Sequence, residues 1–190
     1  MLNKTINFFK DRFPKKTDFK WIKHSEFVQL YKIDVSEDPV RPELDLQFRT
    51  NYDREIYGLK FNDDILGVIC IAYTNDIPCS VKELDLMSQL THLKTFLPSG
   101  MSIGRSQTEL EFFDQDKERV AIAYTVWSKK KGAGKLIMQK ALKHMQDNSG
   151  IDRLVTLSPL TAAATHYHIR NGAKLISINS ISQNFEYELK

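Results

Sequence analysis

Cysteine is scarce in this sequence, and no apolar run is long. The chain has two cysteines, Cys70 and Cys79, which excludes a secreted disulfide scaffold and a four-cysteine zinc site. Cys70 stands in an apolar run, where a small buried thiol is expected. The longest such run spans residues 65–73 and is too short to cross a bilayer, which needs about 20 residues. The opening segment MLNKTINFFKDRF has no long apolar core, so we expect no secretory signal and a cytoplasmic location.

Neither sign of charge is in large excess. The 27 Lys and Arg residues oppose 24 Asp and Glu residues, for a formal net charge of +3. This small positive excess favours anionic ligands but is less than the positive charge expected of a nucleic-acid-binding protein. We therefore expect neither nucleic acid nor a membrane as a partner. The length predicts one domain over residues 1–190, as a monomer or a homodimer. It would have a helical and loop part over residues 1–50 and a core over residues 54–190.

The first half of the chain predicts a hairpin and a helix. The first forty residues indicate short helical pieces and loops, with a break at residues 38–42. Residues 54–61 and 65–73 are β-rich and flank a polar turn at residues 62–64, which predicts a hairpin. Ser80 and Glu83 have the spacing of a capping box. Apolar residues follow at helical intervals, so we expect a helix that runs to about His92. These apolar residues are Leu84, Met87, Leu90 and Leu93.

The second half alternates strands and helices. Residues 119–127 are too continuously apolar for a surface strand and predict a central one. A helix with an apolar stripe at Ile137, Ala141 and Met145 follows, then a buried strand over residues 153–157. A short helix over residues 161–170 precedes an antiparallel pair over residues 173–179 and 183–189. In its last strand Phe185, Tyr187 and Leu189 alternate with Asn184, Glu186 and Glu188, so we expect an α/β fold with a mixed sheet.

A glycine-spaced loop between the central strand and the helix that follows it has the features of an anion-binding loop. Glycine allows close backbone approach, and the first N–H groups of a helix lack partners. The segment predicts a phosphate-binding loop, while the alternative is a solvated lysine face before an ordinary helix. It lacks both the Walker spacing and the three-glycine dinucleotide pattern. The residues concerned are Lys129, Lys130, Lys131, Gly132, Ala133, Gly134 and Lys135.

Residues 129–134 resemble the pyrophosphate loop of the GNAT acyltransferase superfamily. The pattern there is Arg or Gln, two residues, Gly, any residue, then Gly or Ala, and lysine replaces Arg or Gln here. The resemblance implies a mostly antiparallel mixed sheet flanked by helices, and acetyl-CoA or another acyl-CoA as co-substrate. It also implies that the preceding strand pairs with the pantetheine arm through backbone groups of Tyr124, Thr125 and Val126.

The resemblance extends to the following helix. Ala164, His168 and Gly172-Ala173 match the family's A-x-x-x-Y-x-x-x-G-F segment, with histidine at the tyrosine position. In this family that tyrosine commonly protonates the leaving thiolate of coenzyme A, so His168 would be the general acid. An imidazole with an ordinary pKa near 6.5 suits that role.

Four short segments over residues 156–187 resemble malonyl-CoA decarboxylase, whose catalytic domain is a GNAT fold. In order they are TLSP, YHIRNGA, IN and NFEY. The resemblance implies a catalytic pair, in which Ser158 engages the substrate carboxylate and His168 donates a proton to the carbanion. If residues 161–168 form one straight helix, a rise of about 1.5 Å per residue would hold the two side chains roughly 10 Å apart.

Structural roles remain open alternatives for these residues. Ser158 precedes a proline and would also serve as a helix-capping residue, and His168 would also serve as a packed core histidine. Asn179 and Asn184 fit strand ends as well as substrate contacts. Trp127 would be a wall of the cleft or a core residue.

The remaining ionisable residues give no metal site and no general base. His24, His92 and His144 are scattered without partners at ligand spacing, so we expect no metal. Glu109, Glu111 and Glu118 lie upstream of the central strand, and no spacing selects one of them.

Three hypotheses follow. The first is an acyl-CoA-dependent acyltransferase, most simply an N-acetyltransferase. The second is decarboxylation of a malonyl-type thioester by Ser158 and His168. The third is a binder of CoA or nucleic acid without catalysis, which would use the lysine cluster.

Overall fold

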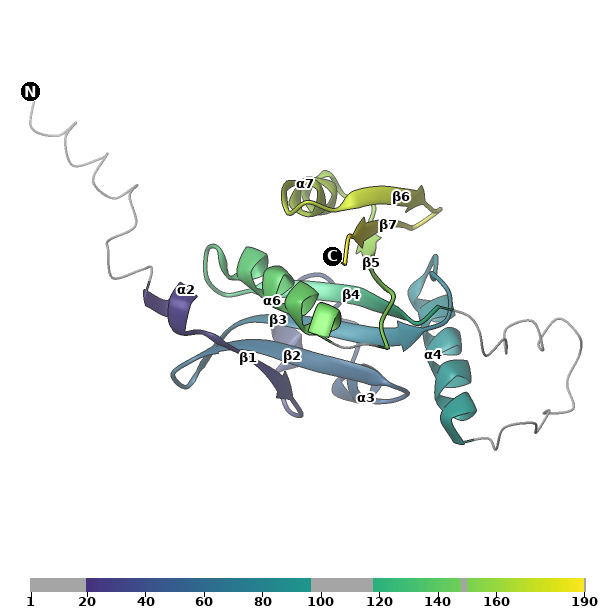
Figure 1. Ribbon diagram of the computed structural model, residues 1–190, viewed down its shortest axis with the longest axis horizontal. Helices are drawn as coiled ribbons and strands as arrows, with labels where there is room; N and C mark the ends of the chain where they lie inside the picture. The colour runs from purple at the N-terminus through teal and green to yellow at the C-terminus, as the bar shows by residue number, and fades with distance from the viewer. Residues whose placement is uncertain (1–19, 97–117, 148–149, 190) are drawn as a thin grey trace, which may run out of the picture.

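A computed structural model describes residues 20–96, 118–147 and 150–189. These residues form one seven-stranded sheet of order β1-β2-β3-β4-β5-β7-β6, in which only the β4–β5 pair is parallel (Figure 1). The expected α/β fold with a mixed, mostly antiparallel sheet is confirmed. The strands are β1 Glu26–Leu30, β2 Arg54–Phe61, β3 Asp64–Thr74, β4 Val120–Ser128, β5 Arg153–Pro159, β6 Lys174–Ile178 and β7 Ser182–Tyr187.

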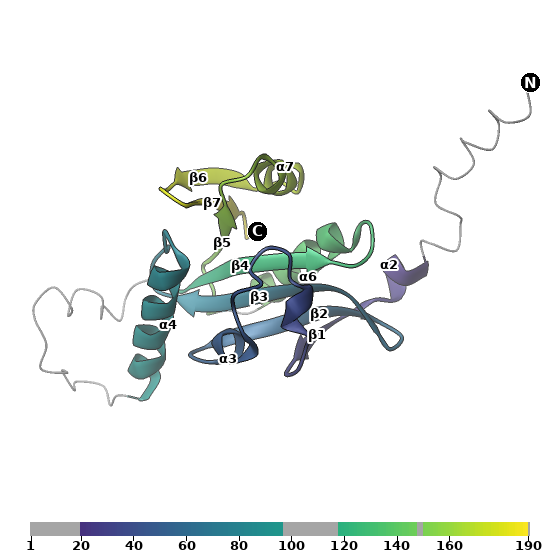
Figure 2. The ribbon, with the colours of Figure 1, turned by 180° about the vertical axis from the view of Figure 1, so that it is seen from behind.

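Helices cover both faces of the sheet. Side chains of α6 and α7 pack into the core cluster on one face, and those of α3 and α4 join the cluster on the other (Figures 1 and 2). The second face also carries the segment of residues 34–49, which we call the strap. The helices are α2 Lys20–His24, η2 Val35–Glu37, α3 Leu46–Thr50, α4 Val81–Phe96, α6 Ala133–Asp147 and α7 Ala162–Arg170.

The predicted hairpin is present, and the predicted capping box forms with one change, because Glu83 bonds the Cys79 amide instead of the Ser80 amide. Strands β2 and β3 pair antiparallel around a turn in which Asn62 has φ 54°. At the start of α4 the Glu83 amide donates to Ser80 Oγ, and the Glu83 carboxylate accepts from the Cys79 amide. The helix extends to Phe96, past the expected end at His92. Leu93 is exposed, so the apolar stripe ends before the helix does.

The N-terminal part contains a strand that the sequence did not predict. β1 lies at the edge of the sheet, and all five of its residues pair with β2. None of these five residues is fully buried. Because an edge strand is half solvated, its sequence lacks the apolar run or strict alternation that marks a strand.

The C-terminal elements follow the predicted order. The helix stripe of Ile137, Ala141 and Met145 is fully buried, and α7 is followed by Gly172 at φ 91° before the β6–β7 pair. In β7, Phe185 and Tyr187 are buried as expected, but Asn184 is buried too. Its amide is held by the Pro78 and Thr156 carbonyls, which is how a polar side chain can be buried at little cost.

No helix in the described ranges is both long and apolar enough to cross a membrane.

Candidate active site

A cleft opens where β4 and β5 diverge. The two strands pair from Val120 to Ala123 and from Arg153 to Thr156, and their pairing stops there. Beyond this point lies a cavity of about 530 Å³. It is lined by Pro39, Val40, Ala123, Tyr124, Thr125, Val126, Trp127, Ser128, Gly134, Leu157, Ser158, Pro159, Thr161, Ala163, Ala164, Tyr167 and His168.

A β-bulge in β4 accounts for the divergence. Cys70 of β3 pairs with Thr125 and Ile71 pairs with Ala123, so Tyr124 is an extra residue without a partner in β3. A bulge bends its strand and increases the local twist. The bend coincides with the last β4–β5 pair, so the bulge turns β4 away from β5.

Ser158 and His168 meet at one end of this cleft. Ser158 Oγ lies 2.7 Å from His168 Nε2, and both side chains are buried. The expected separation of roughly 10 Å is therefore wrong. Between Ser158 and α7 the chain makes a tight turn, in which the Thr161 amide donates to the Pro159 carbonyl at 2.8 Å, and α7 then returns the chain toward Ser158. Sequence distance counted along the helix alone ignored this reversal.

Thr161, not Ser158, caps α7. The Thr161 hydroxyl accepts a hydrogen bond from the Ala164 amide. Ser158 lies in β5 and also donates to Thr156 Oγ1 at 3.2 Å. The capping alternative for Ser158 is thus replaced by a contact with an imidazole.

The His168 ring is held on its other side by a tyrosine. His168 Nδ1 lies 3.0 Å from the Tyr187 hydroxyl, and the ring stacks on Phe185 at a centroid distance of 4.8 Å. Burial lowers the pKa of His168 to about 4, so the ring is neutral near pH 7. A neutral imidazole has one N–H. In one tautomer Nε2 donates to Ser158 Oγ and Nδ1 accepts from Tyr187, which leaves the Ser158 proton for Thr156. In the other tautomer Nε2 accepts the Ser158 proton, so Ser158 no longer donates to Thr156, and Nδ1 donates to Tyr187.

The last glycine of the glycine-spaced loop, Gly134, lines the same cleft. Gly132 has φ 90°, a conformation that favours glycine. A Cβ added at Gly134 would lie 3.4 Å from Ser128 Oγ and from Tyr167 Cε2. The Tyr167 hydroxyl donates to the Gly134 carbonyl at 2.7 Å, so the start of α6 is tied to α7.

Of the predicted site residues, the structure brings Tyr124, Thr125, Val126, Gly134, Ser158 and His168 together around the cavity. The lysines are not among the lining residues. Lys129 Nζ pairs with Glu37 at 2.5 Å, and Lys130 Nζ lies 5.2 Å from the Trp21 ring centroid. Lys131 and Lys135 are exposed, Gly132 is exposed, and Ala133 is buried in the core.

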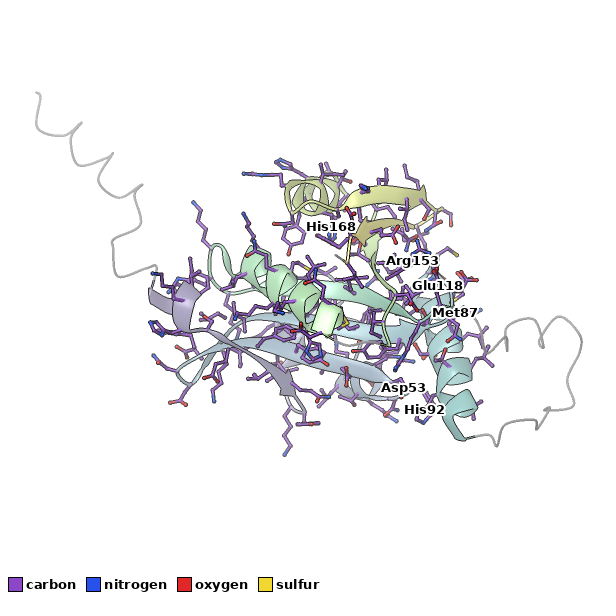
Figure 3. All side chains as sticks on the ribbon, in the orientation of Figure 1. Asp53, Met87, His92, Glu118, Arg153 and His168 are labelled. Carbon is purple, nitrogen blue, oxygen red and sulfur yellow. The ribbon has the colours of Figure 1, made fainter. Side chains whose placement is uncertain are left out.

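Several other candidates lie away from the cleft. Asn179 donates to Asn184 at 2.7 Å, and both serve the β6–β7 turn. Glu118 pairs with Arg153 at 3.7 Å, apart from His168 (Figure 3). Glu109 and Glu111 fall outside the described residues. Within the described ranges no group of three His, Cys, Asp or Glu residues is placed to hold a metal ion.

Sequence reasoning missed the strap and Tyr187. Pro39 and Val40 line the cavity, yet their only signal was a proline-rich break. Tyr187 was predicted as one residue of an alternating strand, and its contact with an imidazole 19 residues away carries no local signature.

Comparison with known proteins gives the fold. No family model and no curated protein matches the chain. Among solved structures, Arabidopsis thaliana NAA60 in complex with acetyl-CoA superposes with a TM-score of 0.53 at 13% identity, covering 86% of this chain and 97% of that one. AtaTR bound with acetyl-CoA gives a TM-score of 0.52 at 12% identity, covering 86% and 94%. The chain has the fold of the GNAT acetyltransferases.

A malonyl-CoA decarboxylase is also among the similar structures. The protein from Cupriavidus metallidurans gives a TM-score of 0.46 at 15% identity, covering 82% of this chain. This chain spans 38% of that protein's length.

Proposed function

We propose that the chain is an acyl-CoA-dependent acyltransferase that binds its thioester in the β4–β5 cleft. One observation carries the proposal: a single cavity has Gly134, at the start of α6, and the Ser158–His168 hydrogen bond in its lining. A cleft of this kind fits a ligand with an anionic end and a reactive end. The GNAT fold of the structures bound to acetyl-CoA supports the same assignment.

Coenzyme A would lie along the cleft from the loop to the histidine. The pyrophosphate would contact backbone N–H groups within residues 129–134, where the helix dipole favours negative charge. The Lys129 and Ala133 amides are excluded, because they donate to the Leu66 and Lys130 carbonyls. The pantetheine arm would run along Tyr124, Thr125 and Val126. The exposed Lys131 and Lys135 would add long-range attraction for the phosphates.

The lowered pKa of His168 changes the expected order of proton transfer. A neutral imidazole accepts a proton first. An acceptor amine would attack the thioester carbonyl, its proton would pass to His168 directly or through Ser158, and the C–S bond would break. The imidazolium would then return the proton to the CoA sulfur, so that His168 serves as base and then as acid.

Decarboxylation of a malonyl-type thioester is a second candidate. The 2.7 Å contact between Ser158 and His168 favours it, since the resemblance required these two residues to act together. The described residues that line the cavity include no Asp or Glu, so nothing there would repel a substrate carboxylate. The C–C bond would break with loss of CO₂, and His168 would protonate the resulting enolate carbon. This needs the imidazolium, whose pKa the substrate carboxylate would raise.

A thermal-shift panel with free CoA, acetyl-CoA and malonyl-CoA tests binding, and product analysis separates the reactions. Acyl transfer releases free thiol from acetyl-CoA in the presence of an amine panel. Decarboxylation converts malonyl-CoA to acetyl-CoA and CO₂ without release of thiol. An unchanged melting temperature with every thioester would remove both candidates, because a ligand at 100 times its Kd adds about 2.7 kcal/mol.

Binding assays with DNA and RNA, run beside this panel, test the expectation that nucleic acid is not a partner. Salt-sensitive binding of DNA or RNA, without any response to CoA, would contradict that expectation and favour a non-catalytic binder.

A further inference from the structure

One side chain from the strap bridges the two strands that form the cleft. Arg41 Nε donates to the Tyr124 carbonyl at 2.8 Å, and Arg41 Nη2 donates to the Leu157 carbonyl at 3.0 Å. Tyr124 belongs to β4 and Leu157 to β5. Figure 2 shows the loop between β1 and α3, which contains Arg41, running across the sheet to β4.

These two carbonyls are the first beyond the end of the parallel ladder. The last β4–β5 pair joins Ala123 to Thr156, and Tyr124 and Leu157 are the next residues on each strand. A carbonyl left without a partner in a partly buried cleft is costly. Because a guanidinium presents several donors in a fixed plane, Arg41 can satisfy both carbonyls at a set separation.

The backbone of Arg41 is itself fixed by a buried ion pair. Asp38 Oδ1 accepts from the Arg41 amide at 3.2 Å, and Asp38 Oδ2 lies 2.9 Å from Arg49 Nη1. Arg49 Nη2 donates to the Arg41 carbonyl at 2.7 Å. Both charged side chains of this pair are fully buried. Thr125, which lines the cavity, donates to Asp38 at 2.8 Å, so the strap is also fastened to the cleft wall.

The position of Arg41 connects this network to the reacting pair. Leu157 immediately precedes Ser158, so a hydrogen bond on the Leu157 carbonyl fixes the peptide that carries the serine. Pro39 and Val40, on the same strap, line the cavity directly. The strap therefore forms one wall of the cleft, and Arg41 sets the spacing between the other two walls.

We propose that Arg41 is a positioning residue. We call it the wedge, because its hydrogen bonds to both strands set the separation between β4 and β5 that the acyl-CoA thioester needs. The identity of the ligand rests on the proposed function, whereas the wedge itself rests on the geometry. Arg41 takes no part in bond making or breaking. Its loss lets the two strands move relative to each other, which displaces Ser158 from the thioester.

The test compares Arg41→Met with Arg41→Lys. Methionine keeps the length and apolar stem but has no donors, while lysine can serve one carbonyl at a time. For the thioester that the wild-type chain turns over, we expect Arg41→Met to raise KM and lower kcat/KM by about tenfold to a hundredfold. Arg41→Lys should recover part of the loss. A small guanidinium compound, added at a concentration that does not unfold the protein, should partly rescue Arg41→Ala.

Arg153 provides a control. It is a half-buried arginine at the start of β5 that pairs with Glu186 at 2.6 Å and with Glu118 at 3.7 Å, and none of these three residues lines the cavity. Arg153→Met should lower the melting temperature but leave KM within about twofold. Equal KM losses in Arg41→Met and Arg153→Met would overturn the proposal, because general destabilisation would then explain both.

Hydrogen exchange separates the wedge from the ligand assignment. Arg41→Met should increase amide exchange in peptides that contain residues 124–127 and 157–159, with β2 and β3 unchanged. Unchanged exchange in these peptides, or an unchanged KM in a folded Arg41→Met variant, would overturn the proposal. If exchange rises there but no thioester shifts the wild-type melting temperature, the wedge stands and the proposed function fails.

Discussion

Ser158 Oγ and His168 Nε2 lie 2.7 Å apart, although nine residues lie between them in the chain. The contact exists because β5 and α7 fold back on each other at Thr161. Tyr187, from a third element, contacts the other ring nitrogen. One hydrogen-bonded line of groups thus runs from the Ser158 hydroxyl through the neutral His168 imidazole to the Tyr187 hydroxyl, and its Ser158 end lines the cavity. Such a line can take up a proton at Ser158 and keep the ring in one orientation.

Replacing His168 tests whether this line is catalytic. We expect His168→Gln to lower turnover by about 10²- to 10⁴-fold, because glutamine cannot exchange a proton with the reactants. Release of free thiol, or formation of acetyl-CoA from malonyl-CoA, measures the effect. His166→Gln is the control, since His166 is exposed on the same helix. Normal turnover in a folded His168→Gln variant would remove the residue from its role.

The pH dependence of stability follows from the buried ring. Burial lowers the pKa of His168 to about 4 from its ordinary value of 6.5, so the unfolded chain binds a proton more readily than the folded one. The stabilisation is complete above about pH 6.5 and is lost as the pH falls toward 4. Its full size is on the order of 3 kcal/mol. Denaturant unfolding at a series of pH values measures it.

His168→Gln is also the comparison for that series. The variant should lose less stability than the wild-type protein over the same acid range, because the proton-binding difference is gone. Parallel pH profiles of the two proteins would show that the His168 pKa is not lowered by folding. Tyr167 and Tyr187, the hydroxyl groups beside the ring, have pKa values raised by burial and stay neutral throughout.

Tyr187 is predicted to act through the histidine. In Tyr187→Phe the ring nitrogen loses its partner, so the tautomer and the orientation of His168 are no longer fixed. We expect kcat to fall while KM for the thioester stays within about twofold, and stability to drop by about 1 kcal/mol. Steady-state kinetics on the thioester that is turned over would show this split. Tyr31→Phe, at an exposed tyrosine, is the matched control. An unchanged kcat in Tyr187→Phe would contradict an orienting role.

Most of the C-terminal half was predictable because its signals are local. The strand over residues 119–127, the stripe of α6 and the Gly172 turn each depend on residues within one element. The bulge at Tyr124 is different, because it is defined by its pairing with Cys70 and Ile71. The same holds for Arg41, whose two acceptors are 83 and 116 residues away. Contacts of that range leave no pattern in a single sequence.

The candidate site was likewise predictable only in part. The resemblance to malonyl-CoA decarboxylase indicated Ser158 and His168, but rise along a helix gave the wrong distance between them. The error came from counting rise along the helix alone, because the chain turns between Pro159 and Thr161 before α7 begins. The lysines of residues 129–131 show the opposite case. Their positive charge was evident from the sequence. Glu37 and Trp21 contact two of them, however, and neither contact could be predicted from the sequence of the loop.

The loop itself is tested by Gly134→Val. A Cβ at this position would lie 3.4 Å from Ser128 Oγ and from Tyr167 Cε2, and the two further methyl groups of valine would add bulk at a position that lines the cavity. We expect the thermal shift produced by CoA to fall to near zero, while the folded protein keeps its circular dichroism spectrum. The control is Gln139→Val, which adds the same side chain at an exposed position of α6. If Gly134→Val bound CoA with wild-type affinity, the pyrophosphate could not lie over the start of α6. The cleft assignment would then depend on the Ser158–His168 end alone.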